Sequence, residues 1–232
     1  MRVSDTSLLG NSRAVFSTQT EIHAQLDKLL QRHSAHPFQK PFSTYNQTAY
    51  TSAIQAWKAA GSAPLILDSG CGVGLSTRHL ASLNPLHFVI GVDQSADRLS
   101  RLHQSVPDIK NFITVRADLV DFWRLLKNDG ITLDYHYVLY PNPWPKKDQL
   151  RRRWHGHAVF PTLLALGGTI ECRSNWKIYV DEFAHALTTL TGQATQCENY
   201  SIHPFALTPF EEKYHASGHS LWRCQLKIPN SA

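Results

Sequence analysis

The stretch Leu65-Ile-Leu-Asp-Ser-Gly-Cys-Gly-Val-Gly74 joins a short apolar run to a glycine-rich turn. Residues 75–83 follow with apolar positions at helical spacing, so the sequence predicts a strand, a tight turn and a helix in succession. Glycines let the backbone turn sharply and let a ligand approach it closely. The N–H groups at the start of the helix can also receive an anionic group. This stretch therefore predicts a ligand-binding corner of an α/β fold.

The spacing of the glycines indicates which cofactor binds there. Gly70, Gly72 and Gly74 give G-x-G-x-G, and Leu75 stands where a dinucleotide fingerprint has its third glycine. With Asp68 just before it, the motif resembles motif I of S-adenosylmethionine (SAM)-dependent methyltransferases. The resemblance implies that Asp68 and the three glycines contact SAM. The alternative, a tight strand–helix turn without a ligand, is disfavoured because acidic residues end the next two predicted strands.

Those acidic residues close the runs Phe88-Val-Ile-Gly-Val-Asp93 and Phe112-Ile-Thr-Val-Arg-Ala-Asp118. In a Rossmann-like site a carboxylate at such a strand end accepts the ribose hydroxyls, which we expect of Asp93 with Gln94 beside it. By analogy with the fold, Asp118 and the adjacent Leu119 lie near the adenine. A single such aspartate would more often be a turn residue or a helix N-cap. Three at consecutive strand ends after a glycine turn indicate a SAM site.

The order of the predicted elements indicates the fold. Strands are predicted near residues 65–69, 87–92, 111–116, 134–140, 168–173, 193–202 and 219–228, and helices at 21–32, 46–60, 75–83, 95–105, 119–127, 148–165, 177–191 and 209–216. The first five strands alternate with helices, which predicts a Rossmann-like, seven-stranded, mostly parallel sheet with helices on both faces and an antiparallel last strand. Residues 1–60 form an N-terminal helical extension whose first 19 residues are polar and expected to be poorly ordered, and residues 61–232 form the methyltransferase domain.

Composition limits the class of protein. The 232 residues suffice for one α/β domain, and a net charge of +5 suits an anionic partner. The four cysteines form no C-x-x-C, and the histidines lack zinc-type spacing, so we expect a cytoplasmic protein with reduced cysteines and no metal. The chain shows no signal-peptide pattern and no long apolar run, so no membrane association is expected.

The stretch Tyr140-Pro-Asn-Pro-Trp-Pro-Lys-Lys147 directly follows the fourth predicted strand. Prolines are excluded from helix and sheet interiors, so the stretch predicts a rigid loop at the carboxyl end of a strand, where open α/β sheets bind ligands. Arg151, Arg152 and Arg153 extend its cationic cluster. A rigid polar loop beside a basic patch indicates chemistry on an anionic substrate, whereas the alternative for the arginines is a solvated helix face.

Together these motifs resemble the bacterial tRNA (guanine-N7)-methyltransferases over roughly residues 45–228. That family has a Pro-Asp-Pro-Trp loop followed by Lys and an Arg-rich helix, a Thr-Asp motif after the fifth strand and a Thr-x-Phe-Glu motif near the C-terminus. The counterparts here are Pro141-Asn-Pro-Trp-Pro-Lys146, Ser174-Asn175-Trp176 with Tyr179, and Thr208-Pro-Phe-Glu211. The resemblance implies SAM as cofactor and tRNA or another RNA as partner, and it leaves monomer or homodimer undecided.

The resemblance also implies residue roles. Asn142 stands where the family has its active-site aspartate, next to the cofactor, and with Glu211 it would orient the base as a catalytic residue. The residues at substrate-contacting positions, several of them cationic, are Trp144, Lys146, Lys147, Arg151, Arg152, Arg153, Asn175, Tyr179, Thr208 and Glu211.

Two family aspartates are asparagines here, Asn142 and Asn175. Guanine N7 carries a lone pair and needs no general base, but methylation makes the base cationic, and a carboxylate would favour that charge. At about 4 Å and an effective dielectric near 20, a unit charge pair is worth ~4 kcal/mol, and an amide loses it. Three activities stay open: methylation of guanine N7 in tRNA, methylation of a nitrogen in another RNA, a protein or a small planar amine, and RNA binding without methylation.

Overall fold

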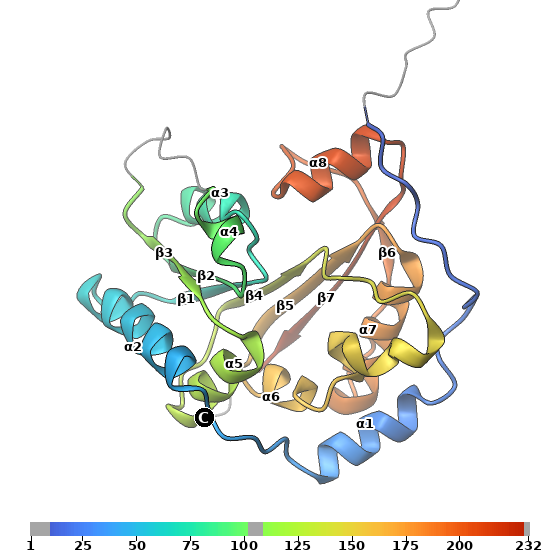
Figure 1. The fold of residues 1–232 in the computed structure, drawn as a ribbon, viewed down its shortest axis with the longest axis horizontal. Coiled ribbons are helices and arrows are strands. Elements are labelled where there is room, and N and C mark those ends of the chain that lie inside the picture. The colour runs from blue at the N-terminus through green and yellow to red at the C-terminus, as the bar shows by residue number, and fades with distance from the viewer. Residues whose placement is uncertain (1–9, 102–108, 230–232) are drawn as a thin grey trace, which may run out of the picture.

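The computed structural model describes residues 10–101 and 109–229. Within them, one sheet has the strand order β3-β2-β1-β4-β5-β7-β6 (Figure 1). The strands are β1 (Leu65–Ser69), β2 (Phe88–Asp93), β3 (Phe112–Arg116), β4 (Tyr135–Leu139), β5 (Gly168–Ser174), β6 (Glu198–Tyr200) and β7 (Leu221–Ile228). The α-helices are α1 (Leu26–Ala35), α2 (Thr44–Ala59), α3 (Leu75–Leu83), α4 (Ala96–Leu99), α5 (Leu119–Asn128), α6 (Phe160–Leu164), α7 (Lys177–Thr191) and α8 (Pro209–Ala216), and two 3-10 segments are η1 (Lys147–Arg152) and η2 (Trp154–Gly156).

Strand direction follows the predicted pattern. β1 pairs in parallel with β2 and β4, β2 with β3, and β4 with β5. β7 lies between β5 and β6 and runs antiparallel to both. At least one helix lies in each crossover between the parallel strands, whereas β6 and β7 form an edge hairpin around α8. The predicted Rossmann-like, mostly parallel sheet with an antiparallel last strand is confirmed.

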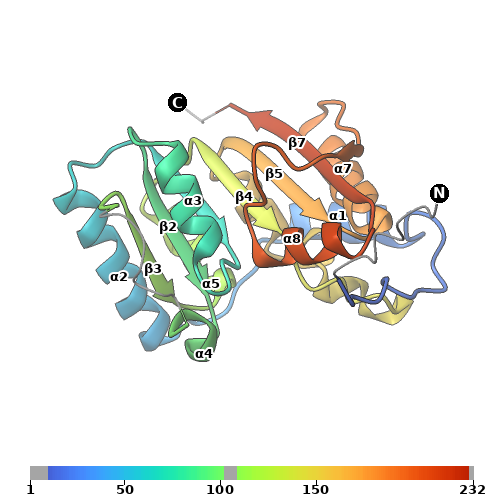
Figure 2. The same ribbon diagram turned by 90° about the horizontal axis from the view of Figure 1, so that it is seen from above.

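Helices cover both faces of the sheet. Figure 1 shows α2, α5, α6 and α1 along one face and α3, α4 and α8 along the other, and Figure 2 shows α2 and α3 on opposite sides of β2 and β3. Successive side chains of the central strands point to opposite faces of the sheet and pack into two hydrophobic cores, one on each face. Ile66 and Val89 pack with Leu80 beneath α3, while Leu65 and Leu67 belong to the larger core on the other face. No helix in the described ranges is long and apolar enough to cross a membrane.

The N-terminal region packs into this larger core. Leu26 and Leu30 of α1 are fully buried in it, and Ala53 of α2 joins them. The stretch before α1 is held as well, because Ser17 Oγ donates to the Pro145 carbonyl and Gln19 is buried. The expectation of poor order is therefore wrong for residues 10–19, and residues 1–9 lie outside the described residues.

Four predicted elements differ from the structure. The helix predicted over 21–32 is α1, which begins only at Leu26 and ends at Ala35. The helix predicted over 148–165 is wrong, because Arg153 is extended (φ −73°, ψ 142°) and separates η1 from η2, with α6 following. The strand predicted over 193–202 is only β6, since the Thr195 N–H bonds the Thr188 hydroxyl and not a neighbouring strand. α4 covers the start of the helix predicted over 95–105, and residues 102–105 lie outside the described residues.

Candidate active site

The candidate site lies where the strand order reverses. β1 and β4 are adjacent and parallel, with Ile66 opposite Tyr135 and Asp68 opposite Tyr137. From β1 the chain continues into the glycine turn toward α3 on one face, and from β4 it continues into the 140–146 loop. Both segments therefore leave the same edge of the sheet, side by side, at the position where open α/β sheets bind ligands.

The glycine turn provides an open surface. Gly70, Gly72 and Gly74 have φ angles of 86°, 58° and 77°, a region that side chains other than glycine rarely adopt. A Cβ atom added at Gly70 or Gly72 would meet no atom within 4 Å. The turn thus needs glycine for its conformation, and the space above these two residues is open to a ligand.

Asp68 anchors this turn from below. It is 1% exposed, and its Oδ2 accepts from Ser76 Oγ at 2.6 Å and from Thr77 Oγ1 at 2.8 Å, both in the first turn of α3. Burial raises its pKa to about 6, although the two hydroxyl groups oppose that shift. The geometry assigns Asp68 to holding α3 against β1, and its predicted contact with SAM stays a prediction.

Asp93 joins the turn to the end of β2. Its Oδ2 accepts from the Gly72 N–H at 3.0 Å and its Oδ1 from the Ser95 N–H at 2.8 Å, and Arg98 lies 3.6 Å away. Each carboxylate oxygen can accept a second hydrogen bond, so this carboxylate can still receive ribose hydroxyls. The open glycine turn and the fixed carboxylate fit SAM, and Gln94 follows in an exposed position.

The predicted adenine end of the site, at Asp118, is held in place by Asn46, a residue that the sequence analysis did not identify. Asp118 caps α5 by accepting from the Val120 N–H, and its own N–H donates to Asn46 Oδ1 of α2. The Asn46 amide also donates to buried Asp121 at 2.7 Å, so α2 fixes this strand end. No local motif marks Asn46. Leu119 is buried beside it, and the roles of Asp118 and Leu119 at adenine stay predictions.

The 140–146 loop has an unusual backbone. Tyr140 and Trp144 have φ angles of 49° and 44°, which are uncommon for residues other than glycine. Such conformations persist where surrounding contacts enforce them, and they cluster at functional sites. Asn142 is exposed, and its Oδ1 accepts weakly from the Trp144 N–H at 3.4 Å. The Arg152 guanidinium lies 4.7 Å from the centre of the Trp144 ring.

The cationic cluster divides into exposed and buried members. Lys146, Lys147, Arg151 and Arg152 are exposed around the loop, as a role in RNA contact requires. Arg153 is 0% exposed, so the prediction that it faces the RNA backbone is wrong. Its guanidinium instead donates to the carbonyls of Trp144 and Lys146, the two residues that flank Pro145. Arg153 therefore holds the loop from inside.

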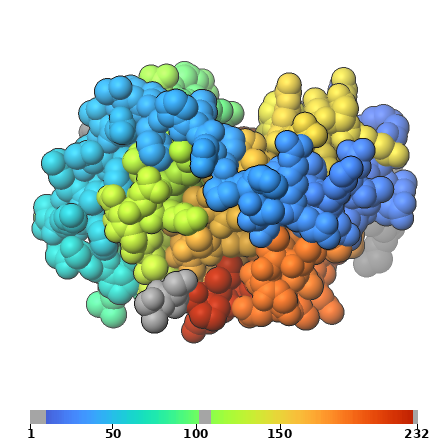
Figure 3. All heavy atoms as spheres, turned by 90° about the horizontal axis from the view of Figure 1, so that it is seen from below, coloured from blue at the N-terminus to red at the C-terminus, as the bar shows by residue number. Residues whose placement is uncertain are grey.

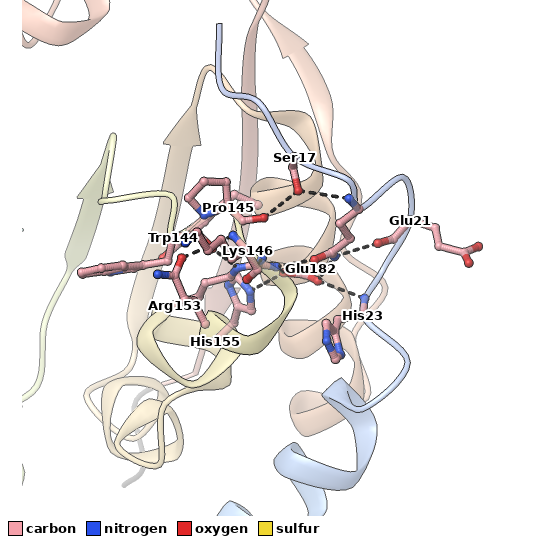
Figure 4. A network of polar contacts seen from close by, with 12 residues as sticks. Ser17, Glu21, His23, Trp144, Pro145, Lys146, Arg153, His155 and Glu182 are labelled. Carbon is pink, nitrogen blue, oxygen red and sulfur yellow. Dashed lines mark hydrogen bonds and ion pairs between the residues drawn. The ribbon is translucent and has the colours of Figure 1, made fainter.

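A buried carboxylate, Glu182 of α7, organises this interior. It accepts from Arg153 Nη1 at 2.6 Å, His155 Nε2 at 2.8 Å, Gln19 Nε2 at 2.6 Å and the His23 N–H at 2.9 Å. Burial alone would raise its pKa, but the hydrogen bonds and charges of His155 and Arg153 outweigh it and lower the pKa to about 2. Figure 4 shows these groups converging on Glu182, with the Trp144 ring pointing away from them. The Glu182 network thus ties the N-terminal segment to the loop.

Glu211 is a positioning residue rather than one that touches a base. It is 0% exposed, and it accepts from Tyr140 Oη at 2.9 Å, Arg173 Nη1 at 2.9 Å and the Leu207 N–H at 2.6 Å. The predicted direct catalytic and substrate contacts of Glu211 are therefore wrong in this arrangement. Thr208 is the N-cap of α8, since its Oγ1 accepts from the Glu211 N–H, and its role at the substrate stays a prediction.

Two further predicted substrate contacts have different positions. Tyr179 is fully buried and its hydroxyl accepts from the Trp154 N–H, so its predicted substrate contact is wrong. Asn175 is half-buried, and its Nδ2 lies 3.0 Å from His219 Nδ1. The role of Asn175 at the substrate stays a prediction.

A buried polar chain lies under the site and predicts a pH effect. Trp123 Nε1 donates to Ser69 Oγ, which lies 2.8 Å from His136 Nε2, and burial lowers the pKa of His136 to about 3. Below about pH 6.5, His136 becomes protonated in the unfolded protein but stays neutral in the folded protein. The contribution of His136 to the free energy of unfolding is therefore highest above about pH 6.5 and declines as the pH falls. Between about pH 7.5 and about pH 5, the wild type should lose ~2 kcal/mol more free energy of unfolding than His136→Gln.

Urea unfolding at the two pH values measures this difference. His215→Gln, which removes an exposed histidine, serves as the matched control and should keep the wild-type pH dependence. The raised pKa of Asp68 acts in the opposite direction in all three proteins and cancels in the comparison. Equal losses in the wild type and His136→Gln would contradict a neutral buried His136.

The region that contains the candidate site is similar in sequence to known methyltransferases. Residues 62–224 match a family described as "Putative methyltransferase". The tRNA (guanine-N(7)-)-methyltransferase of Acidovorax sp. (strain JS42) is 28% identical over 168 residues, which are 69% of this chain and 66% of that protein. The protein of the same name from Ralstonia pickettii (strain 12J) is 27% identical over 186 residues, which are 76% of this chain and 72% of that protein. The chain thus spans about two thirds of the length of these relatives.

Solved structures agree on the fold. A structure described as an antibiotic related methyltransferase superposes with a TM-score of 0.54 at 15% identity, over 82% of this chain and 97% of that chain. The 16S rRNA methyltransferase KamB superposes with a TM-score of 0.51 at 15% identity, over 82% and 95%. At this identity the likeness concerns the fold alone, and it confirms the Rossmann-like prediction. Because the family match runs through the glycine turn, the 140–146 loop and the end of β5, the chain belongs to this methyltransferase family.

Proposed function

We propose that this protein transfers the methyl group of SAM to N7 of a guanine in tRNA. The observation that carries the proposal is the juxtaposition, at the β1–β4 switch point, of the open glycine turn and the loop that carries Asn142 and Trp144. Relatives that share the sequence across this region are named tRNA (guanine-N(7)-)-methyltransferases, which supports the choice of substrate. A tRNA substrate also fits the predicted cytoplasmic location.

The residues of this chain have a positioning task. SAM supplies an electrophilic methyl group on a sulfonium centre when bound, and Gly70, Gly72 and Asp93 are the residues that would hold it. Guanine N7 carries no proton, so no side chain has to remove one, and the rate depends on alignment. The side-chain oxygen of Asn142, which an aspartate would retain, can accept from an N–H group of the guanine and so orient the base. The half-buried Trp144 ring provides a surface on which a base can stack.

Substitutions of Asn142 test whether a negative charge near the methylated guanine would speed the reaction. The methylated base is cationic, but the negative charge of Glu211 is already paired with Arg173, so Glu211 does not replace the missing family aspartates. We therefore expect Asn142→Asp to raise kcat for guanine N7 about 10-fold, since a carboxylate stabilises the developing charge. Asn142→Ala should lower kcat roughly 10- to 100-fold, because the base loses an orienting group.

The experiment is methyl transfer from labelled SAM to bulk tRNA from a strain that lacks the ordinary guanine-N7 enzyme, followed by mass spectrometry of nucleosides. Labelled 7-methylguanosine supports the proposal. Asn128→Ala, an exposed asparagine at the end of α5, is the matched control and should leave the rate unchanged. If the label appears on an amino group, Asn142 acts as an acceptor for that amine and Asn142→Asp is expected to be slower. SAM binding without any labelled nucleoside would contradict the proposal.

A further inference from the structure

A cavity is lined by residues outside the glycine turn and the 140–146 loop. It has a volume of about 540 Å³ and lies between the end of α1, the α1–α2 linker and residues 151–158. Two arginines and three histidines line it: Arg32, His33, His36, Arg151 and His157. The described residues that line this basic pocket include no carboxylate. Figure 3 shows the blue linker and the yellow segment around residue 150 beside one another on this face.

The histidines present donors to the pocket. His157 Nδ1 accepts from the Val159 N–H, so the proton of its neutral ring is on Nε2. His36 Nδ1 lies 3.1 Å from the Arg32 carbonyl, to which it donates, so its Nε2 becomes a second donor once the ring is protonated.

The charges in the pocket repel one another. The pKa of His33 is lowered by burial first and then by the charges of His157, Arg32 and Arg151. The pKa of His157 is lowered by burial, although Asp118 opposes the shift. Arg32 and His33 also lie in the last turn of α1, where cations interact favourably with the helix dipole, but Arg151 and His157 belong to another segment. An anion in the pocket would relieve this repulsion.

We propose that the basic pocket binds a backbone phosphate of the RNA whose base enters the candidate active site. The inference rests on the proposed function. Arg151 lines the pocket and lies in η1, which begins directly after the 140–146 loop. The exposed Arg152 next to it lies 4.7 Å from the centre of the Trp144 ring, so exposed cations occur both at the loop and at the pocket. The contact is to phosphate and carries no base preference, so the pocket sets the register of the RNA on the enzyme.

The test uses Arg32→Gln combined with His36→Gln. Both residues are exposed, so the variant keeps the fold, which thermal unfolding verifies. At about 0.1 M salt and neutral pH, the Kd for tRNA should rise about 5- to 10-fold, and the slope of log Kd against log salt should flatten by about one phosphate contact. The Kd for SAM should not change. Lys58→Gln, a cation in the last turn of α2, is the matched control and should bind like the wild type.

The pH dependence of RNA binding shows whether the histidines of the basic pocket contribute to binding, or only the arginines and lysines of the surface. A short uridine oligonucleotide carries no guanine, and its phosphodiesters keep their charge over this pH range. Because an anion favours protonated imidazole, its binding should tighten as the pH falls from about 8 to about 6, and less so in the variant. The groups that face these rings are Arg32, Arg151 and Asp118, with Arg124 packed on the neighbouring Phe38 ring.

The outcomes separate the pocket from the proposed function. Methylation of tRNA by the wild type, with equal Kd and salt slope in the variant, overturns the pocket and leaves the proposed function standing. Pocket-dependent binding of RNA without methylation supports the pocket and contradicts the proposed function. If the wild type binds neither tRNA nor the uridine oligonucleotide, both inferences are wrong.

Discussion

The Glu182→Gln substitution is expected to lower the free energy of unfolding by about 3–5 kcal/mol, because it leaves the buried Arg153 guanidinium without its counter-charge. Glu182 and Arg153 are both fully buried and 2.6 Å apart. The carboxylate also accepts from Gln19 and His23, so the loss extends to the N-terminal segment. Urea unfolding at neutral pH measures the change. Because the pKa of Glu182 is lowered in the folded state, this stabilisation is present above about pH 4.5 and lost as the pH falls toward 2.

The neighbouring surface carboxylate provides the matched control. Asp181 pairs with Lys177 one turn earlier on the exposed side of α7, and Asp181→Asn should change the stability by less than ~0.5 kcal/mol. Since Arg153 also holds the Trp144 and Lys146 carbonyls, Glu182→Gln should reduce methyl transfer more than it weakens SAM binding. Equal stability of the two variants would mean that the network does not hold the loop.

The Asp93→Ala substitution should weaken SAM binding about 100-fold, since two hydrogen bonds from ribose hydroxyls to a carboxylate are worth ~3 kcal/mol. The same change leaves the Gly72 and Ser95 N–H groups without their acceptor and loosens the glycine turn. Asp93→Asn keeps one acceptor and should lie between the wild type and Asp93→Ala. Calorimetry with SAM measures the Kd.

Asp97→Ala controls for charge and position. Asp97 lies four residues further along, on α4, where it is exposed and pairs with Arg101. Its removal should change the Kd for SAM less than about threefold, because exposed pairs contribute little. A similar Kd in Asp93→Ala and Asp97→Ala would exclude Asp93 from the cofactor site. Both variants fold if the stability loss of Asp93→Ala stays near ~2–3 kcal/mol, which thermal unfolding checks.

Local pattern alone determined the sheet. The apolar runs that became β1, β2 and β3 each end at or next to a polar residue, and the intervening helices force parallel pairing. The spacing of the glycines likewise predicted the turn at residues 70–74. The left-handed backbone conformation there requires residues without a Cβ, and this is a local property of the chain. The 140–146 loop followed from its prolines in the same way. These features depend on neighbours in the chain, so they can be derived from the sequence.

Tertiary structure decided which polar side chains face solvent. Three consecutive arginines, Arg151, Arg152 and Arg153, cannot be told apart from the local sequence. Only the side chain of Arg153 is buried, because it pairs with the buried carboxylate of Glu182, which is distant in the sequence. The inward turn of Arg153 also breaks the helix predicted over 148–165. Glu211 was predicted to meet the substrate, but Arg173 and Tyr140 surround it. Long-range pairing of buried charges outweighs local helix propensity and motif position, since an unpaired charge in the interior costs several kcal/mol.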